Sequence, residues 1–387
     1  MNKTIDQKWF DSKLTLSGAF VVDVLFRNRK SKTLHVESED DLLSFAGQNG
    51  VAALLYKKLS GKAGSTIPAS VLASLKNEYL RTLVLNTNLL KKAHEINSIL
   101  RNKGVEPVFL KGILLAPFLY RDPALRPMGD IDLLVSEKEV QEAYDVLIEE
   151  GAVPADPMEK DHASNHHLPM IIFKSAPVEI HRFLTSKDSD YFIPPISIFS
   201  KKITWSNGRE ELPGPSFIDA FIYMAVHVYY TFLRGGMRLS WMYDFYLMTE
   251  QEGKAVDVKS KEFTERVKDW NVEYPVCFIS VLLSFLLGKE PEFKEWKKDK
   301  KLLQDLSLAA GFFSTPPDDS EFYSYRLIWE QVKNTKGFKN KVRIFKIKLF
   351  RRSDENVISR FAKLSGRFSG MIFNSTKLSL KRLFRRF

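Results

Sequence analysis

The chain has 387 residues, enough for two or three domains with separate cores, and 44% of them are hydrophobic, as in ordinary folded proteins. The single cysteine, Cys277, excludes an internal disulfide and a metal cluster built on cysteines. The net charge of +11 is concentrated in residues 336–387, where sixteen Lys and Arg against two acids give +14, so the preceding residues carry −3. The main body is therefore close to neutral, and the basic character belongs to a C-terminal tail.

Two patterns bear on where the protein is found. The first residues, MNKTIDQKWFDSKL, contain scattered charges and no continuous apolar segment typical of a signal peptide. The longest apolar run, Val276–Leu287, is too short to cross a bilayer as a helix. We therefore expect a cytoplasmic protein, with peripheral attachment to the inner face of the membrane as the alternative.

Residues 1–100 are expected to be helical. Hydrophobic residues recur at helical spacing from Leu42 to Leu55 and along a longer run from Val71 to Leu100. No residue in this region suggests chemistry.

The chemistry begins with the segment VEPVFL, Val105–Leu110, which predicts a short strand. Lys111 and Gly112 follow it, and Ile113–Tyr120 predicts an apolar helix. A strand, a glycine and a helix in this order direct backbone N–H groups toward an anion, and Lys111 adds a positive charge there. A Lys-Gly pair is more commonly a surface lysine that precedes a glycine in a turn.

The most informative segment is Asp130–Val135 (DIDLLV), which predicts a strand. Residues two apart on a strand face the same side, so Asp130 and Asp132 project together. Neighbouring carboxylates raise each other's pKa unless a cation or a basic group lies between them. Such a pair is often solvated at the end of a surface strand, but the apolar flanks favour burial, which requires a partner such as a divalent metal.

A second pair of polar residues follows. Lys138–Glu150 predicts a helix, and His167–Phe173 and Val178–Leu184 predict two strands. Glu179 and His181 lie two apart on the second strand and share a face. Glu179 could complete a cluster with the two aspartates, although an exposed glutamate on an amphipathic strand is the simpler interpretation when no aspartate pair is present.

The pattern becomes helical again from Ser216 onward. One helix carries His227 on an apolar face, where a lone histidine is more often a hydrogen-bonded core residue than a catalyst. Leu239–Met248 predicts another helix, which contains Asp244. Further helices are predicted at Val276–Leu287, Lys301–Ala310 and Phe322–Val332.

The tail, residues 336–387, alternates bulky apolar residues with cations. Phe338, Val342, Phe345 and Leu349 follow helical spacing among basic residues. Basic amphipathic helices of this kind bind anionic membrane surfaces, nucleic acids or other polyanions, or pack on the protein's own core.

Several segments together resemble a known family. The principal ones are Leu110–Gly112 (LKG), Tyr120–Arg126 with its Asp-Pro pair, and the strand Asp130–Val135. On these residues the sequence resembles the uncharacterised bacterial nucleotidyltransferases of the DNA polymerase β-like superfamily. Val178–His181 is similar to that group's third-carboxylate strand, and His227 with Trp241–Asp244 is similar to its helical half. The resemblance covers about residues 40–250.

The resemblance implies an α+β fold, in which a small mixed β-sheet forms the nucleotidyltransferase core and helical regions flank it. We expect a helical N-terminal region at 1–100, the core at 101–190, a helical C-terminal domain at 191–335 and the basic amphipathic tail at 336–387.

The resemblance also implies the chemistry. A nucleoside monophosphate, with AMP as the first candidate, would pass from an NTP donor to a hydroxyl acceptor with the help of two Mg²⁺ ions, or of Mn²⁺ in their place. The catalytic residues and metal ligands would be Asp130, Asp132 and Glu179. The nucleotide-binding residues would be Lys111, Gly112 and Arg126. The candidate accessory residues are His181, His227 and Asp244.

One alternative is a catalytically silent nucleotide-binding or regulatory module with the same fold. Lys111 and Gly112 stand where the superfamily usually has Gly followed by Gly or Ser, which favours this alternative, whereas the presence of all three acids counts against it. The acceptor could be a small molecule, a polysaccharide, a protein or an RNA, because no segment of the sequence selects one of them.

Overall fold

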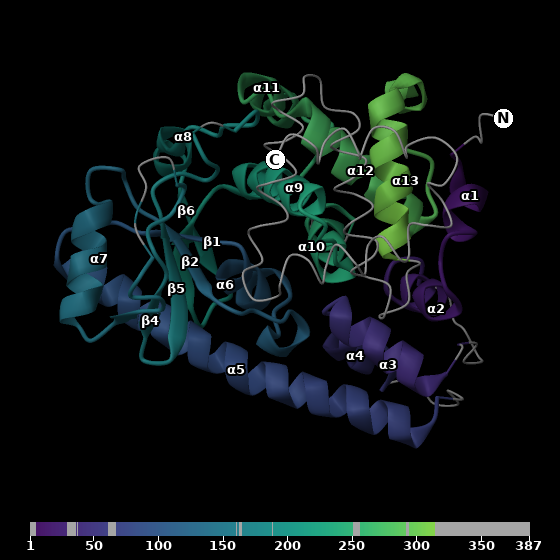
Figure 1. The fold of residues 1–387 in the computed structure, drawn as a ribbon, viewed down its shortest axis with the longest axis horizontal. Coiled ribbons are helices and arrows are strands. Elements are labelled where there is room, and N and C mark those ends of the chain that lie inside the picture. Colours follow the sequence, from purple (N-terminus) through teal and green to yellow (C-terminus); the bar gives the residue numbers. More distant parts are fainter. Residues whose placement is uncertain are drawn as a thin grey trace, which may run out of the picture. The chain divides into compact units, whose positions relative to one another are not determined.

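A five-stranded mixed β-sheet with helices around it organises the chain in the computed structural model (Figure 1). The structure describes residues 5–28, 36, 38–60, 67–159, 161, 165–187, 189–250, 256–291 and 294–313. This arrangement confirms the predicted α+β fold with a small mixed sheet. The basic tail predicted at 336–387, and the helix predicted at Phe322–Val332, lie outside the described residues.

The order of the strands brings the two predicted acidic strands together. The sheet runs β1-β2-β5-β4-β3, and its strands are β1 (Val108–Leu110), β2 (Ile131–Leu134), β3 (Val153–Pro154), β4 (Ile171–Phe173) and β5 (Ala176–His181). The central pair, β2 and β5, is parallel, and the other pairs are antiparallel. A parallel pair needs a long connection, which here includes helix α7 (Val140–Glu149). Strand β2 contains Asp132 and begins one residue after Asp130, and β5 contains Glu179 and His181 but begins and ends earlier than the predicted segment.

The hydrophobic residues of β2 explain its central position. All four of its residues, Ile131 to Leu134, are buried, as the apolar sequence around the aspartates predicts. The sequence turns tightly before β5, where Lys174 and Ser175 both have positive φ angles of 48° and 73°. This turn pairs β4 with β5 in the antiparallel register that aligns Ile171 with Val178.

The N-terminal helices include one unusually long helix. They are α1 (Gln7–Asp11), α2 (Leu16–Leu25), α3 (Glu39–Gln48), α4 (Ala52–Leu59) and α5 (Ala69–Asn102). Figure 1 shows α5 extending from α3 and α4 to the sheet. The buried Asn86 of α5 donates hydrogen bonds of 2.5 and 2.7 Å to the carbonyl oxygens of Pro123 and Arg126. Helix α5 therefore fixes the loop that leads into β2.

The second half of the described chain is mostly helical. Its helices are α8 (Pro195–Ser200), α9 (Phe217–Leu233), α10 (Leu239–Thr249), α11 (Lys261–Asp269), α12 (Glu273–Leu287) and α13 (Lys300–Phe312). A separate two-stranded sheet, β6 (Ile203–Ser206) and β7 (Glu211–Gly214), was not predicted. None of the described helices is both long enough and apolar enough to cross a membrane.

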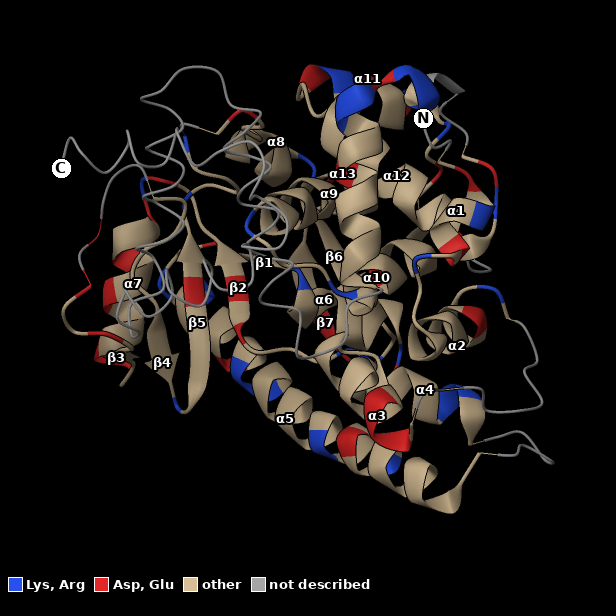
Figure 2. Ribbon diagram, turned by 45° about the vertical axis from the view of Figure 1, so that its right-hand side comes forward, with Lys and Arg blue, Asp and Glu red and all other residues tan. Residues whose placement is uncertain are grey.

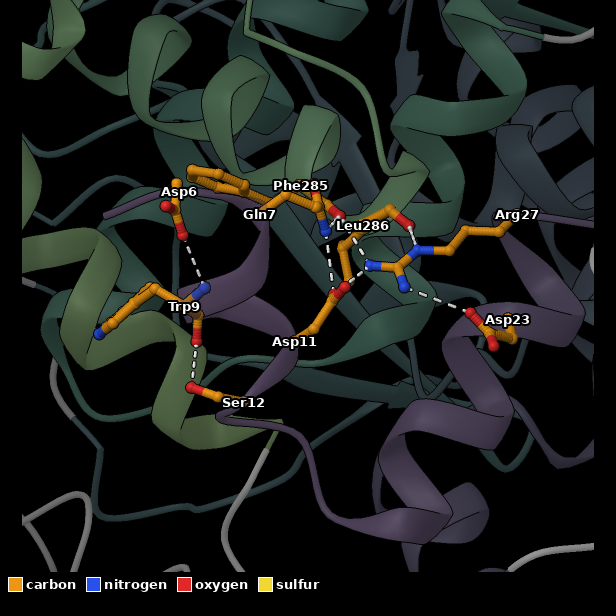
Figure 3. A network of polar contacts seen from close by, with 9 residues as sticks. All are labelled: Asp6, Gln7, Trp9, Asp11, Ser12, Asp23, Arg27, Phe285 and Leu286. Atoms are coloured by element: carbon orange, nitrogen blue, oxygen red, sulfur yellow. Dashed lines mark hydrogen bonds and ion pairs between the residues drawn. The ribbon is translucent and has the colours of Figure 1, made fainter. Parts of the chain in front are cut away.

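The N-terminal segment is tied to the end of α12 by polar contacts (Figure 3). Arg27 donates hydrogen bonds to the carbonyl oxygens of Phe285 and Leu286, and its guanidinium also pairs with Asp11 at 2.6 Å. Gln7 donates a further bond to the Phe285 carbonyl. These carbonyl groups lie in the last turn of α12, at the negative end of the helix dipole, and the carbonyl of Phe285 also accepts a hydrogen bond from the backbone N–H of Gly288. A cationic side chain there stabilises the helix and joins the N-terminal segment to α12.

All described residues belong to one compact unit, Met1–Tyr323. The division into regions at 1–100, 101–190 and 191–335 stays a prediction.

Candidate metal and nucleotide site

The predicted carboxylates meet on the two central strands. In the parallel register Asp132 of β2 lies directly beside Glu179 of β5, and Asp130 immediately precedes β2. Figure 2 shows acidic segments, in red, on the neighbouring strands β2 and β5. Asp132 is only 3% exposed, whereas Asp130 and Glu179 are partly buried. Three acidic side chains therefore gather at one place, and we call them, with Lys111 and His181, the carboxylate cluster.

His181 lies inside this cluster and bridges two of the acids. Its Nε2 atom is 2.9 Å from Oδ1 of Asp132 and 3.5 Å from Oε2 of Glu179, and its side chain is fully buried. Burial disfavours the imidazolium form, but the hydrogen bonds to Asp132 and Glu179 outweigh burial and raise the pKa of His181. Among the described residues, no hydrogen-bond partner is found for its Nδ1 atom.

Lys111 supplies the basic group that the aspartates require. It follows β1 directly and has a φ angle of 52°, a backbone conformation that is strained for a lysine. Its Nζ atom donates a hydrogen bond of 2.6 Å to Oδ1 of Asp132. Burial opposes the charge of both groups, but their mutual attraction raises the pKa of Lys111 and, with His181, lowers the pKa of Asp132.

Asp130 is less well compensated. Burial, followed by the charge of Asp132, raises the pKa of Asp130 to about 6. Lys111 and His181 act in the opposite direction without cancelling this effect. Additional positive charge near Asp130 would favour its ionised form.

The cluster has the ligand types and spacing of a metal site. One oxygen each from Asp132 and Glu179 and a nitrogen of His181 lie within 4.8 Å of one another. Carboxylate oxygens and imidazole nitrogens are ordinary ligands of divalent metals, and the burial of the set limits competition from water. The residues therefore fit a divalent ion, with Asp130 beside them as a further carboxylate.

Gly112 and Arg126 lie close together, next to the cluster. A Cβ atom on Gly112 would come within 2.7 Å of Nη1 of Arg126 and 3.0 Å of Met128, so a side chain there would have to displace Arg126, which Asp244 holds in place. Gly112 begins the short helix α6 (Gly112–Leu114), which continues as a π-helical turn at Leu115–Leu119. The predicted apolar helix after Lys111 is therefore present, with a change of helical form inside it.

Arg126 is held by Asp244. Asp244 was predicted from the sequence as an accessory residue of the site. Nε and Nη2 of Arg126 donate to both carboxylate oxygens of Asp244 at 2.9 to 3.1 Å, and Tyr120 donates to one of them at 2.7 Å. Asp244 is fully buried. We call this set the Arg126–Asp244 pair. It occupies two of the three guanidinium nitrogens, so the role of Arg126 in binding nucleotide stays a prediction.

Helix α9 contributes two residues near the cluster. Tyr223 is buried, which raises the pKa of its hydroxyl group, and the nearby charge of Lys111 acts in the opposite direction. His227 lies one helical turn later, with its ring 6.2 Å from the ring of Tyr223. Burial, then the charge of Lys111, lowers the pKa of His227 well below its ordinary value, so His227 is neutral. Tyr223 was not predicted, although its spacing of four residues from His227 was visible in the sequence.

Two more histidines pack against His181. The ring centroids of His166 and His167 lie 5.4 and 5.6 Å from that of His181. Burial, then the charge of His181, lowers the pKa of His166 to about 3. His166 is therefore neutral at physiological pH, and it lies beside the carboxylate cluster without belonging to its ligand set.

The comparisons with known proteins agree with this geometry. A family described as uncharacterised nucleotidyltransferase matches residues 36–288 of the chain. No curated protein and no solved structure matches it significantly. Because the family match covers more than half of the chain, the protein belongs to this family and is a nucleotidyltransferase. This confirms the predicted nucleotidyltransferase family, whereas the bacterial origin and the superfamily stay predictions.

Proposed function

We propose that this nucleotidyltransferase moves a nucleoside monophosphate from an NTP, with ATP as the first candidate donor, to a hydroxyl group of its acceptor. The observation that carries the proposal is the carboxylate cluster, in which Asp130, Asp132 and Glu179 converge beside Lys111. A set of buried acids of this kind is suited to a reaction that brings polyphosphate and metal ions together.

Asp130, Asp132 and Glu179 would hold two divalent ions, Mg²⁺ or Mn²⁺. When bound, these ions would neutralise the phosphates of the donor and activate the acceptor hydroxyl group. Asp132 has the most central position, because it contacts both Lys111 and His181 and lies beside Glu179 in the register. It is therefore the residue best placed to be shared between the two ions.

Lys111 would move from Asp132 to the phosphates. In the structure its ammonium group neutralises Asp132, and once metal ions take over that role it can donate to oxygens of the triphosphate. Gly112 would contribute indirectly, because its lack of a side chain lets Arg126 pack directly against the backbone that follows Lys111. Arg126 would contribute through Nη1, the nitrogen that faces Gly112.

The transfer itself is a displacement at the α-phosphorus. The bond from the acceptor oxygen to the α-phosphorus forms as the bond to the bridging oxygen of the β-phosphate breaks, and pyrophosphate leaves. Glu179 is partly exposed and accepts the proton of the acceptor hydroxyl group. Contact with His181 lowers the pKa of Glu179, which keeps it ionised before the reaction.

A labelled-donor assay tests this proposal. The full chain would be incubated with each NTP labelled at the α-phosphate, with Mg²⁺ or Mn²⁺, and with acceptor fractions of small molecules, polysaccharide, protein or RNA. We expect label in one fraction together with released pyrophosphate, and loss of both with the Asp130→Asn, Asp132→Asn double variant. The exposed Asp269→Asn on α11 is the matched control. Equal transfer by wild type and double variant would refute the proposal.

The tail supports a further proposal about location. Its basic amphipathic pattern at 336–387 suits attachment to an anionic membrane surface. Co-sedimentation with anionic liposomes would compare the full chain with a chain ending at Thr335. Equal pelleting of both would exclude this role, and binding to nucleic acid that weakens steeply with salt would assign the tail to a polyanion instead.

A further inference from the structure

The metal position beside β5 differs from a site made only of carboxylates. Its three ligand atoms are one oxygen of Asp132, one oxygen of Glu179 and a nitrogen of His181. Mg²⁺ prefers oxygen ligands and water. An imidazole ligand favours binding of Zn²⁺ most strongly and of Mn²⁺ less strongly, and it favours both of these ions over Mg²⁺. A nitrogen ligand therefore changes which ion the position selects.

The orientation of His181 is fixed by the sheet. The residue ends β5, pairs with Leu134 of β2 and forms a bridge with His167. Its side chain is fully buried, and the same nitrogen, Nε2, points at both Asp132 and Glu179. In the structure this nitrogen donates the proton that joins the acids, and a bound ion would take the place of that proton. The imidazole needs no rearrangement to become a ligand.

The other side of the cluster has a different composition. On that side Asp130 and Asp132 offer only carboxylate oxygens. Asp130 is not one of the three ligands of the other position, which are Asp132, Glu179 and His181. Two positions that share Asp132 would thus differ in ligand type, one with oxygen ligands alone and one with oxygen and nitrogen. Different ligand types select different ions.

We infer that the position formed by Asp132, Glu179 and His181 binds a first-row transition ion, such as Mn²⁺ or Zn²⁺, in preference to Mg²⁺, through Nε2 of His181. The inference rests on the proposed function only where it assigns this metal position to the activation of the acceptor hydroxyl group. The binding of the ion itself needs neither donor nor acceptor.

The test is metal binding by the full chain without nucleotide. Titration calorimetry would compare Mn²⁺, Zn²⁺ and Mg²⁺, and pulsed electron paramagnetic resonance of bound Mn²⁺ would detect coupling to a directly bonded ¹⁴N nucleus. We expect nitrogen coupling in the wild type, and Mn²⁺ binding at least about tenfold tighter than that of Mg²⁺. Absence of nitrogen coupling, or equal affinity for Mn²⁺ and Mg²⁺, would overturn the inference.

Paired variants identify the ligand. His181→Gln should remove the nitrogen coupling and weaken Mn²⁺ binding by about 10-fold to 100-fold, with Mg²⁺ binding changed much less. His166→Gln alters a neighbouring histidine outside the ligand set and should keep both properties. Nitrogen coupling that survives in a folded His181→Gln protein would overturn the inference. If that variant fails to fold, the presence or absence of nitrogen coupling in the wild-type spectrum tests the inference. A protein with the coupling but no transfer to any acceptor would refute the proposed function and leave this inference standing.

Discussion

The carboxylate cluster and the Arg126–Asp244 pair are both buried and charged, but they differ in how completely their charges are satisfied. Asp244 accepts hydrogen bonds on both oxygens, from Arg126 and Tyr120, and one guanidinium faces one carboxylate. In the carboxylate cluster three acids face two basic side chains. Burial raises the pKa of both Asp130 and Asp244, so the two sets differ in the number of cations for each carboxylate and not in this shift. The first set is complete as it stands, whereas the second can accept further positive charge.

This difference separates a set that mainly stabilises the fold from a set that is suited to binding a metal ion. A satisfied ion pair fixes the loop after Tyr120 relative to α10, and removing one partner leaves a buried charge alone. An incompletely neutralised group of acids is less favourable for folding but ready to bind a cation. Variants in the two sets should therefore produce opposite combinations of changes in stability and activity.

The largest effect on activity is expected from Glu179→Gln in the carboxylate cluster. The amide cannot accept the acceptor's proton and is a poorer metal ligand, so kcat for nucleotidyl transfer should fall at least about a thousandfold. Donor binding should change much less, because the donor phosphates are assigned to Lys111 and the aspartates. Steady-state kinetics would measure kcat and KM separately. Wild-type kcat in this variant would contradict the assignment of Glu179.

The largest effect on stability is expected from Arg126→Met in the Arg126–Asp244 pair. Asp244 would remain fully buried without its cation, so the free energy of unfolding should fall by about 3 to 5 kcal/mol in urea denaturation. Tyr120→Phe removes only one hydrogen bond and should cost about 1 kcal/mol. A small loss in Arg126→Met would show that the pair is not the structural element described above.

Asp130→Asn should stabilise the metal-free protein at neutral pH. The pKa of Asp130 is raised to about 6 in the folded state and is about 4 in the unfolded chain, so the folded state holds the proton more tightly. The free energy of unfolding of the wild type therefore falls as pH rises from about 4 to 6 and stays lower above that range. The variant cannot ionise, and we expect it to be more stable by about 1 to 2 kcal/mol at pH 7.5, with a difference that shrinks toward pH 4.

Denaturation with a chelator present, at pH 4.5 and pH 7.5, would measure this difference. Saturating Mg²⁺ should shrink or reverse it, because only the wild type keeps the position formed by Asp130 and Asp132, whereas both proteins keep the position formed by Asp132, Glu179 and His181. An unchanged difference between the two pH values would contradict the explanation based on the pKa of Asp130.

The smallest effect concerns Lys111. Its ammonium group contacts the same oxygen of Asp132 that His181 contacts, so it competes with a metal ion for that oxygen. Lys111→Met should raise the affinity for Mn²⁺ about tenfold in the absence of nucleotide, while lowering the affinity for NTP. Calorimetry of both ligands would measure the two changes. Weaker Mn²⁺ binding in the variant would show that Lys111 supports the metal position and does not compete for it.

The local part of the site could be predicted from the sequence. The alternation of residues in Asp130–Val135 and in Val178–His181 places acids on strand faces, because that alternation is a property of the strand itself. The parallel pairing that aligns Asp132 with Glu179 also agrees with the expected cluster. The strands were found about where the patterns placed them.

Contacts between distant residues could not be predicted. Arg126 and Asp244 are 118 residues apart, and nothing in either segment specifies the other as its partner. The contact between Lys111 and Asp132 was not predicted, because a sequence shows charges without their separation, and the assignment of Lys111 to phosphate stays a prediction. The hairpin of β6 and β7 was missed although Asn207 and Gly208 are a common turn pair between strands.

The most direct test of the central claim is calorimetric titration of each NTP, with Mg²⁺ or Mn²⁺, into the wild type and the Asp130→Asn, Asp132→Asn double variant. The carboxylate cluster predicts metal-dependent binding of one preferred NTP to the wild type, and loss of that binding in the folded double variant. Binding of the NTP with equal affinity to both proteins, or without any dependence on metal, would contradict the claim that these acids form the nucleotidyl-transfer site.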